Sequence, residues 1–212
     1  MQEVYIFDLD GTIIDSISSV IELTWKFHNE RNIPIAEDII AKILPLGYPK
    51  TAEYYVRAYH LQESPKEIER YLINNITKKY EESIPAKGSA DEVLRALKSR
   101  GVTLAILTAS PRSFLDPCVK RLGWDVLFDY TWSVDEFGKT KGEPDLFLDV
   151  AKCLGVETKD CFMIDDSAHA LSSAKKAGMK TIGIYDEYSN ANLLEEMHKV
   201  ADQFVYDLKE IL

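Results

Sequence analysis

The sequence predicts an α/β fold: a doubly wound, mainly parallel sheet with a small α-helical unit inserted into it. Over most of the chain, short apolar runs alternate with longer segments of helical periodicity, which is typical of a parallel sheet covered by helices on both faces. Residues 15–85 break this alternation, because helical segments follow one another there without a buried strand between them. We therefore predict a core formed by residues 1–14 and 86–212, and a helical domain formed by residues 15–85.

The strands of the predicted sheet are five short apolar runs: residues 4–7, 103–107, 161–164, 180–184 and 203–205. The helices between them should end at four glycines, since glycine accepts the left-handed backbone of a helix C-terminus: Gly101, Gly123, Gly155 and Gly178. Ser89 to Glu92 have the pattern of a capping box. Pro117 predicts either a kink or a fresh helix start capped by Asp116.

Within the inserted unit, Ser64 to Glu67 combine a capping box with Pro65 at the first helical position. The first helix is predicted to bury one face, which carries Ile14, Ile17, Ile21, Trp25 and His28.

The composition limits the classes of partner. The 212 residues have 46% hydrophobic content, which suffices for one large core and a smaller unit. The formal net charge of -10 opposes binding to nucleic acid and to anionic membranes. A phosphate-bearing ligand would therefore have to be bound by local positive charge.

The cysteines and the start of the sequence lead us to expect a cytoplasmic protein. Cys118, Cys153 and Cys161 lack metal-ligand spacing, and the sequence opens on a strand-like run rather than a signal peptide. No apolar run approaches the roughly 18 residues that cross a bilayer.

Two carboxylates, Asp8 and Asp10, directly follow the first predicted strand. Residues two apart in an extended segment point the same way, so both can face one crevice, and Gly11 permits a sharp exit. Two carboxylates this close repel each other unless a cation or a shared proton intervenes. We take a divalent metal as the simplest solution.

Polar residues follow three further strands or helix entries. Thr108, Ala109 and Ser110 precede a helix start, which favours an anion. Lys141 is an ammonium that can neutralise a phosphoryl oxygen. Asp165 and Asp166 follow the strand at 161–164, and hard oxygen ligands from Asp8 and Asp166 suit Mg²⁺. Each of these signals alone is explained more simply as a turn, a helix cap or a solvated charge. Together they lie at the carboxyl ends of the predicted strands, which is where open α/β sheets bind ligands.

Together, these motifs resemble the haloacid dehalogenase-like hydrolase superfamily, in its phosphatase branch. The resemblance covers nearly the whole chain: Asp8 to Thr12 match its opening Asp-x-Asp-Gly-Thr, and Thr108, Lys141 and the pair Asp165 and Asp166 match its later motifs. It implies a Rossmann-like sheet, and it makes the helical insertion that family's cap. Gly142 departs from the pattern where proline often follows the lysine, and Ala170, after His169, departs where glycine is common.

The resemblance also implies a role for each matched residue. Asp8 is the expected nucleophile and Asp10 the general acid and base, with its backbone carbonyl on the metal. Asp8 and Asp166 are the expected carboxylate ligands of Mg²⁺, and Asp165 supports them directly or through water. The transferring phosphoryl group would be held by Thr108, Ala109 and Lys141.

The expected reaction is hydrolysis of a small phosphate monoester, such as phosphoglycolate or a sugar phosphate, through an aspartyl-phosphate intermediate. A cap of about 70 residues favours a small phosphorylated metabolite over polymers. Gly47, Lys50 and Arg112 are candidates for substrate specificity. Lys50, Arg57, Lys87 and Arg112 are cations suited to a substrate's distal group.

Three alternatives remain open at this point. The first is the sugar phosphomutase branch of the same superfamily. That branch has a cap histidine where this chain has Val20, and His28 is a weak substitute for it. A signalling receiver domain also uses an aspartate, a threonine and a lysine, but lacks an inserted helical unit. A binding protein that has lost turnover would keep the same residues. The oligomeric state is not predicted.

Overall fold

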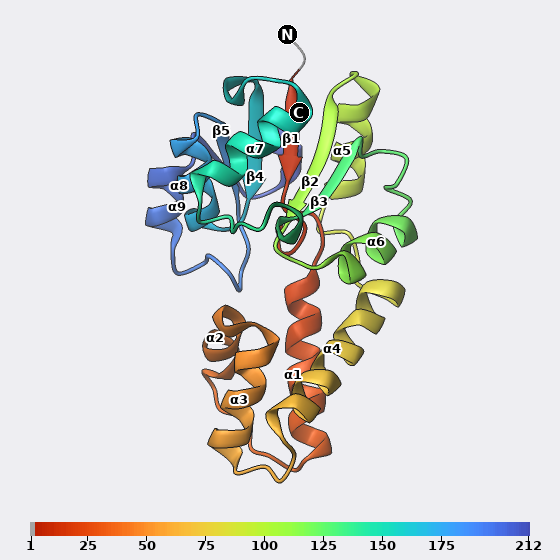
Figure 1. The fold of residues 1–212 in the computed structure, drawn as a ribbon, viewed down its shortest axis with the longest axis vertical. Helices are drawn as coiled ribbons and strands as arrows, with labels where there is room; N and C mark the ends of the chain where they lie inside the picture. Colours follow the sequence, from red (N-terminus) through yellow and green to blue (C-terminus); the bar gives the residue numbers. More distant parts are fainter. Residues whose placement is uncertain (1–2) are drawn as a thin grey trace. The chain divides into compact units, whose positions relative to one another are not determined.

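The computed structural model describes residues 3–212, with side chains for all of these but Pro45. The chain forms two compact units (Figure 1). The larger, which we call the sheet unit, comprises the residues up to Asp15 together with Pro85–Leu212. The smaller, the helical unit, is Ser16–Ile84. That the helical unit acts as a cap stays a prediction.

The sheet unit contains a six-stranded parallel sheet in the order β3-β2-β1-β4-β5-β6. This confirms the predicted fold class. The chain runs outward from β1 through β2 to β3 and then returns to the other side of β1 with β4. The carboxyl ends of β1 and β4 therefore lie at a topological switch point, where open α/β sheets bind ligands. The strands are β1 (Val4–Phe7), β2 (Thr103–Thr108), β3 (Tyr130–Ser133), β4 (Cys161–Asp165), β5 (Lys180–Ile184) and β6 (Gln203–Val205).

Five of these strands were predicted and β3 was missed. β3 is an edge strand of four residues, and its first three are exposed or half-buried. A strand of this kind lacks the continuous apolar run that identifies a buried parallel strand.

The helices of the sheet unit cover both faces of the sheet, because successive strand residues point to opposite sides. Val4 and Ile6 belong to a buried cluster with residues of α7 and α8. Phe7 points the other way and packs its ring edge-on against Phe128, with 6.3 Å between ring centroids. These helices are α5 (Ala90–Ser99), α6 (Arg112–Arg121), α7 (Pro144–Leu154), α8 (Ala168–Lys176) and α9 (Leu194–Val200).

One predicted detail of these helices was wrong, and one of the two alternatives given for Pro117 is excluded. Ser89 does not cap α5, because its hydroxyl donates to the carboxylate of Asp207 instead. Asp116 does not start a new helix, since α6 is one helix with Pro117 inside it. The four predicted glycine stops do have left-handed backbone.

The helical unit consists of α1 (Ser16–Glu30), α2 (Ile39–Ile43), α3 (Gly47–Tyr59) and α4 (Pro65–Glu82). The capping box at Ser64 is present. The predicted buried face of α1 was correct for Ile14 and His28 but wrong for Trp25, which is 38% exposed. Leu23 and Phe27, outside that face, are buried. Leu23 and Phe27 are one turn apart, and Phe27 stacks on Tyr55 of α3 with 4.5 Å between ring centroids.

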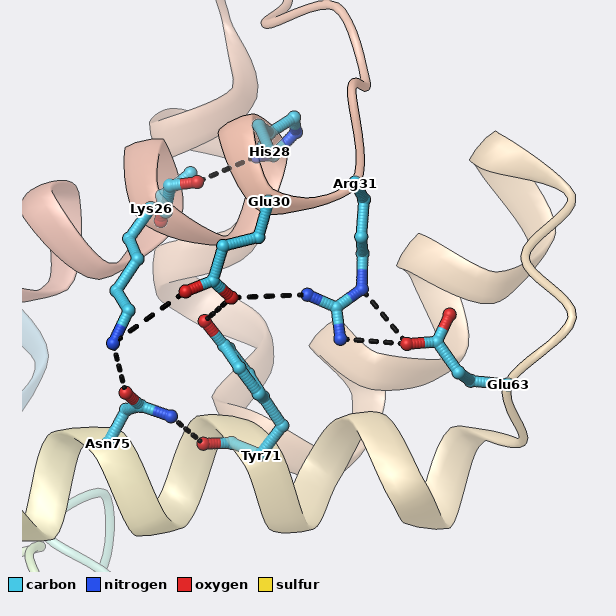
Figure 2. Close-up of polar contacts among 8 residues, drawn as sticks. Lys26, His28, Glu30, Arg31, Glu63, Tyr71 and Asn75 are labelled. Carbon is cyan, nitrogen blue, oxygen red and sulfur yellow. Dashed lines mark hydrogen bonds and ion pairs between the residues drawn. The ribbon is translucent and has the colours of Figure 1, made fainter.

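Polar contacts join α1 to α4 at the surface of the helical unit (Figure 2). Lys26 donates to Asn75 at 2.8 Å and Tyr71 donates to Glu30 at 2.5 Å. The guanidinium of Arg31 lies 4.0 Å from the ring centroid of Phe27 and donates to Glu63. These contacts fix the first helix of this unit against the last.

Among residues 3–212, none of the helices combines the length and the apolar character needed to cross a membrane. Cys118 and Cys161 are buried, Cys153 is exposed, and all three are free thiols. Burial raises the pKa of both Cys118 and Cys161 to about 11, so these two thiols stay protonated and behave as apolar core residues.

Candidate active site

The register of the sheet brings three polar segments to one edge. Phe7 of β1 is aligned with Ile106 of β2 and with Ile164 of β4. Asp8, Thr108 and Asp165 follow at or just beyond these positions, at the carboxyl ends of their strands. Residues separated by about 100 and 157 positions of sequence thus become neighbours because parallel strands end together.

Asp8 lies at the centre of this edge. Its backbone N–H donates to the carbonyl of Ile164 at 2.9 Å, which extends the pairing of β1 with β4 by one residue. Its side chain is buried and accepts a hydrogen bond from Nζ of Lys141. The same ammonium donates to Oδ2 of Asp165 at 2.8 Å. Lys141 therefore bridges two carboxylates from neighbouring strands.

Asp165 is oriented from its other side by its own loop. Its Oδ1 accepts from the backbone N–H of Ser167 at 2.8 Å. Ser167 is the N-cap of α8, and its hydroxyl accepts from the backbone N–H of Ala170. The start of α8 thus fixes the side chain of Asp165 in place.

Three buried carboxylates gather around this point. One carboxylate oxygen from each of Asp8, Asp165 and Asp166 lies within 4.8 Å of those of the other two. One ammonium cannot neutralise three negative charges, and buried charge without compensation is costly. Carboxylate oxygens are the ligands of hard divalent cations, so the donor set fits such an ion.

The protonation tendencies of these groups follow from burial and mutual repulsion. Burial raises the pKa of Asp8 well above its usual value; Lys141 opposes the rise, and the neighbouring carboxylates add to it. Burial, with repulsion from Asp165, raises the pKa of Asp166 to about 7. Burial by itself would lower the pKa of Lys141, but Asp165 and Asp8 outweigh it and raise that pKa. Lys141 is thus held as a cation, and an additional positive charge would favour the ionised form of Asp8.

Asp10 belongs to a separate set of hydrogen bonds. Its Oδ2 accepts from the hydroxyl of Ser110 at 2.6 Å and from that of Thr108 at 3.4 Å. The hydroxyl oxygen of Thr108 also accepts from the backbone N–H of Ser110 at 3.0 Å. The loop after β2 therefore orients the carboxylate of Asp10. Of the two hydroxyls that donate to Asp10, that of Ser110 is the closer. Ser110 was noted at this strand end from sequence but was not among the predicted site residues.

The turn after Asp10 depends on Gly11. Gly11 has a φ of 73°, a left-handed conformation that few other residues adopt without strain. Its N–H donates to the carbonyl of Ile14 at 3.1 Å, and the N–H of Ile13 donates to Leu9 at 3.0 Å. This tight loop returns the chain toward α1 directly after the two aspartates.

A second group of polar residues, with Lys87 half-buried and Asp186 buried, adjoins these loops and was not assigned to the catalytic site from sequence. Lys87 donates through Nζ to the carbonyl of Gly11, to that of Tyr185 at 2.9 Å and to Oδ2 of Asp186 at 2.7 Å. Burial opposes the effect, but Lys87 and two backbone N–H groups lower the pKa of Asp186. Asp186 follows β5 by two residues, so the strand-end rule could have identified it.

Among the predicted specificity residues, Arg112 makes its described side-chain contacts outside this cluster. Arg112 donates to Glu136 at 2.8 Å, to Asp116 at 3.1 Å and to Thr131 at 2.9 Å. Its guanidinium is thus engaged within the sheet unit. Gly47 and Lys50 are exposed residues of α3 in the helical unit. The roles of all three in specificity stay predictions.

Comparisons with known proteins identify the family of this chain. The family model described as haloacid dehalogenase-like hydrolase matches residues 5–184. The chain belongs to this family. The matched region contains the whole helical unit and the segments of the sheet unit that carry Asp8, Asp10, Thr108, Lys141, Asp165 and Asp166.

Relatives and solved structures extend over the whole chain. A phosphorylated carbohydrates phosphatase of Thermotoga maritima is 23% identical and covers 99% of this chain and 100% of its own length. A phosphoglycolate phosphatase of Colwellia psychrerythraea is 26% identical and covers 97% of this chain and 93% of its own. A solved Thermotoga maritima structure with a provisional β-phosphoglucomutase name has a TM-score of 0.85 at 23% identity, over 100% of this chain and 97% of that one.

Gly142, one of the two departures from the family pattern, lies against His169, the residue before the other departure, Ala170. A Cβ atom on Gly142 would overlap Nε2 of the His169 ring. The histidine therefore occupies space that a side chain at position 142 would need, next to Lys141. The residues at positions 142 and 169 are coupled through this contact.

Replacing Gly142 by Ala is expected to lower the free energy of unfolding by about 1–2 kcal/mol because of this overlap. In the Gly142→Ala/His169→Ala double variant the loss should disappear, since the ring is gone and alanine restricts the unfolded chain. Urea denaturation of the two single variants and the double variant measures the coupling. A loss that persists in the double variant would contradict it.

Proposed function

We propose that this enzyme hydrolyses a small phosphate monoester in a Mg²⁺-dependent reaction, with Asp8 as the nucleophile and an aspartyl-phosphate as the intermediate. The observation that carries the proposal is the buried carboxylate of Asp8, which contacts Lys141 and lies within 4.8 Å of carboxylate oxygens of Asp165 and Asp166. In a hydrolase of this family, such a group has the nucleophile and the charge partner that phosphoryl transfer requires.

Phosphatase activity is the reaction class that the relatives support. Two whole-length relatives are named phosphatases, one for phosphorylated carbohydrates and one for phosphoglycolate. Both act on small phosphorylated molecules, in agreement with the net charge of -10, which disfavours polyanions.

In the first step, a carboxylate oxygen of Asp8 attacks the phosphorus atom and the bond from phosphorus to the substrate oxygen breaks. The electron pair of that bond goes to the leaving oxygen, which takes a proton from Asp10. Lys141 offsets the negative charge on the phosphoryl oxygens, and the loop of Thr108 and Ala109 supplies hydrogen-bond donors for them. The products of this step are the free alcohol and phosphorylated Asp8.

In the second step, a water molecule attacks the same phosphorus atom and gives its proton to the carboxylate of Asp10. The bond between phosphorus and Asp8 breaks, which releases inorganic phosphate and restores both aspartates. The hydroxyl of Ser110, 2.6 Å from Asp10, orients the carboxylate for both proton transfers.

Mg²⁺ would be held by the carboxylates of Asp8 and Asp166 and by the backbone carbonyl of Asp10, with Asp165 in support. When bound, it supplies positive charge that stabilises the phosphoryl oxygens and lowers the repulsion among these carboxylates. The three side chains fit this role because they are buried together and carry more negative charge than Lys141 neutralises.

Transfer of phosphate within a sugar is the alternative reaction, and the helical unit argues against it. The residue at the position of the mutase histidine is Val20. His28 is fully buried, with Nδ1 2.8 Å from the carbonyl of Thr24 and Nε2 3.2 Å from the hydroxyl of Tyr59. It is a core residue of the helical unit, which leaves water as the better supported phosphoryl acceptor.

The direct test is a panel of phosphorylated metabolites, including phosphoglycolate and hexose phosphates, assayed for phosphate release with Mg²⁺ and with EDTA. We expect Mg²⁺-dependent release from several members and a ranking that identifies the substrate class. Release that is equally fast in EDTA, or none from any member, would contradict the proposal.

Mg²⁺ is also expected to stabilise the folded protein. At a free concentration about 100 times the dissociation constant, a ligand adds about 2.7 kcal/mol to the free energy of unfolding. Thermal unfolding with and without Mg²⁺ measures this effect. Asp166→Asn should reduce the stabilisation strongly, whereas the exposed Asp125→Asn should leave it unchanged; equal stabilisation of both variants would exclude Asp166 as a ligand.

A further inference from the structure

Lys87 is a cation outside the cluster around Asp8 whose ammonium makes three hydrogen bonds. Its Nζ donates to two backbone carbonyls, those of Gly11 and Tyr185, and to the carboxylate of Asp186. The ammonium thus uses its three hydrogen atoms inside the sheet unit. A lysine with this set of partners is held in place and is poorly suited to meet a substrate's distal group, the role that the sequence suggested for it.

The partners of Lys87 reach both catalytic loops. Gly11 directly follows Asp10, the proposed acid and base. Asp186 is joined to Asn190, whose Oδ1 accepts from the backbone N–H of Asp186 at 3.0 Å. The Nδ2 of Asn190 donates to the backbone carbonyl of Asp166 at 2.9 Å. A continuous chain of hydrogen bonds therefore runs from the loop of Asp10 to the loop of Asp166.

The backbone around Lys87 is held by the same loop. Its N–H donates to the carbonyl of Ile13 at 2.9 Å, and the N–H of Asp15 donates to the carbonyl of Pro85 at 3.0 Å. Ile14 and Ala86 form an antiparallel bridge between these two contacts. The two segments through which the chain leaves and re-enters the sheet unit are thus paired where Lys87 meets the Asp10 loop.

We propose that Lys87 is a positioning residue for proton transfer by Asp10: its ammonium holds the Gly11 carbonyl, and with Asp186 and Asn190 it fixes the Asp10 loop relative to Asp166. This inference rests on the proposed function, because it assigns Lys87 an effect through the acid and base of that reaction. Lys87 touches neither substrate nor phosphorus, and it acts through the backbone next to Asp10.

The test compares two substrates of similar shape that differ in their need for an acid. Phenyl phosphate releases a basic phenolate that benefits from a proton, whereas the 4-nitrophenolate of 4-nitrophenyl phosphate leaves without one. The quantity compared is kcat/KM, which reports the steps through phosphoryl transfer to Asp8. We expect Lys87→Met to lower kcat/KM for phenyl phosphate at least about tenfold more than for 4-nitrophenyl phosphate, because general acid catalysis contributes factors of about 10²–10⁴.

Four further variants make the result specific. Asp10→Asn should show the same selective loss in larger measure, and Lys87→Arg should recover part of it by keeping the charge. Lys175→Met is the matched control, because Lys175 also contacts a backbone carbonyl, that of Val200 at 3.3 Å, and a carboxylate, that of Asp202 at 2.7 Å. This variant should leave kcat/KM for both substrates unchanged. If Lys87→Met does not fold, Asp186→Asn replaces it, because it removes the charge that pairs with Lys87 and keeps the side-chain volume. It should lower kcat/KM for phenyl phosphate more than for 4-nitrophenyl phosphate.

Equal losses on both substrates, or no loss on either, would overturn the role of Lys87. Asp8→Asn is assayed in parallel to separate this failure from failure of the proposed function. If Asp8→Asn stays active, the proposed function fails. If Asp8→Asn is inactive while Lys87→Met affects both substrates equally, only the inference about Lys87 fails.

Discussion

Replacing Asp8 by Asn is expected to lower turnover of a phosphate monoester by a factor on the order of 10⁴ to 10⁶, as loss of a covalent nucleophile does in other enzymes. The amide has nearly the shape of the carboxylate but is a far weaker nucleophile toward phosphorus. Steady-state release of phosphate in the presence of Mg²⁺ measures the loss.

The structure separates this effect from loss of the fold. Burial raises the pKa of Asp8, which means that ionised Asp8 is held at a free-energy cost in the folded protein. A neutral amide relieves that cost, so the variant should keep the far-ultraviolet circular dichroism of the parent. Asp125→Asn, at an exposed position, is the control for loss of one negative charge. Turnover within tenfold of the parent would remove Asp8 from the role of nucleophile.

Replacing Asp10 by Asn is expected to slow steady-state turnover by about 10²–10⁴, because both proton transfers lose their acid and base. With 4-nitrophenyl phosphate, the first step needs little acid, so the enzyme should still be phosphorylated. Stopped-flow absorbance should then show a burst of about one 4-nitrophenolate per active site, followed by slow release.

Ser110→Ala is the matched comparison for this variant. It removes the 2.6 Å hydrogen bond to Asp10 while the carboxylate remains, so its loss should be smaller and without a burst. Unchanged multiple-turnover kinetics in Asp10→Asn would contradict the assignment of proton transfer to this residue.

The cluster around Asp8 could be predicted from sequence because its members follow a general rule. Asp8 and Asp165 come at the carboxyl ends of buried strands, and neighbouring parallel strands bring such ends together. The apolar runs before them are short and continuous, so the strands themselves were also recognised. Lys141 lies on a loop; its ammonium made it a candidate for neutralising a phosphoryl oxygen, and the family resemblance then supported its place in the site.

The network of Lys87, Asp186 and Asn190 could not be assembled from sequence in the same way. Each of its contacts with the loop of Asp10 or Asp166 involves a backbone carbonyl, which leaves no residue pattern to detect. Only Asp186, two residues beyond β5, had a position that the strand-end rule covers. Lys87 in isolation has the appearance of a surface cation.

Local signals failed where tertiary contacts offered a better partner. Ser89 has the sequence of a helix cap, yet its hydroxyl donates to Asp207, 118 residues away. In α1, Leu23 and Phe27 are buried while Trp25 is exposed, because packing within the helical unit decides which face is covered. Helical periodicity in α1 was compatible with either face.

Reductive trapping during turnover tests the central claim most directly. Sodium borohydride converts an aspartyl-phosphate into homoserine, and mass spectrometry of proteolytic peptides locates the converted residue. With a turning-over substrate and Mg²⁺, the proposed mechanism predicts homoserine at position 8, and none when the substrate is omitted. Conversion at another aspartate, or an unmodified Asp8 under conditions of full turnover, would contradict covalent catalysis by Asp8.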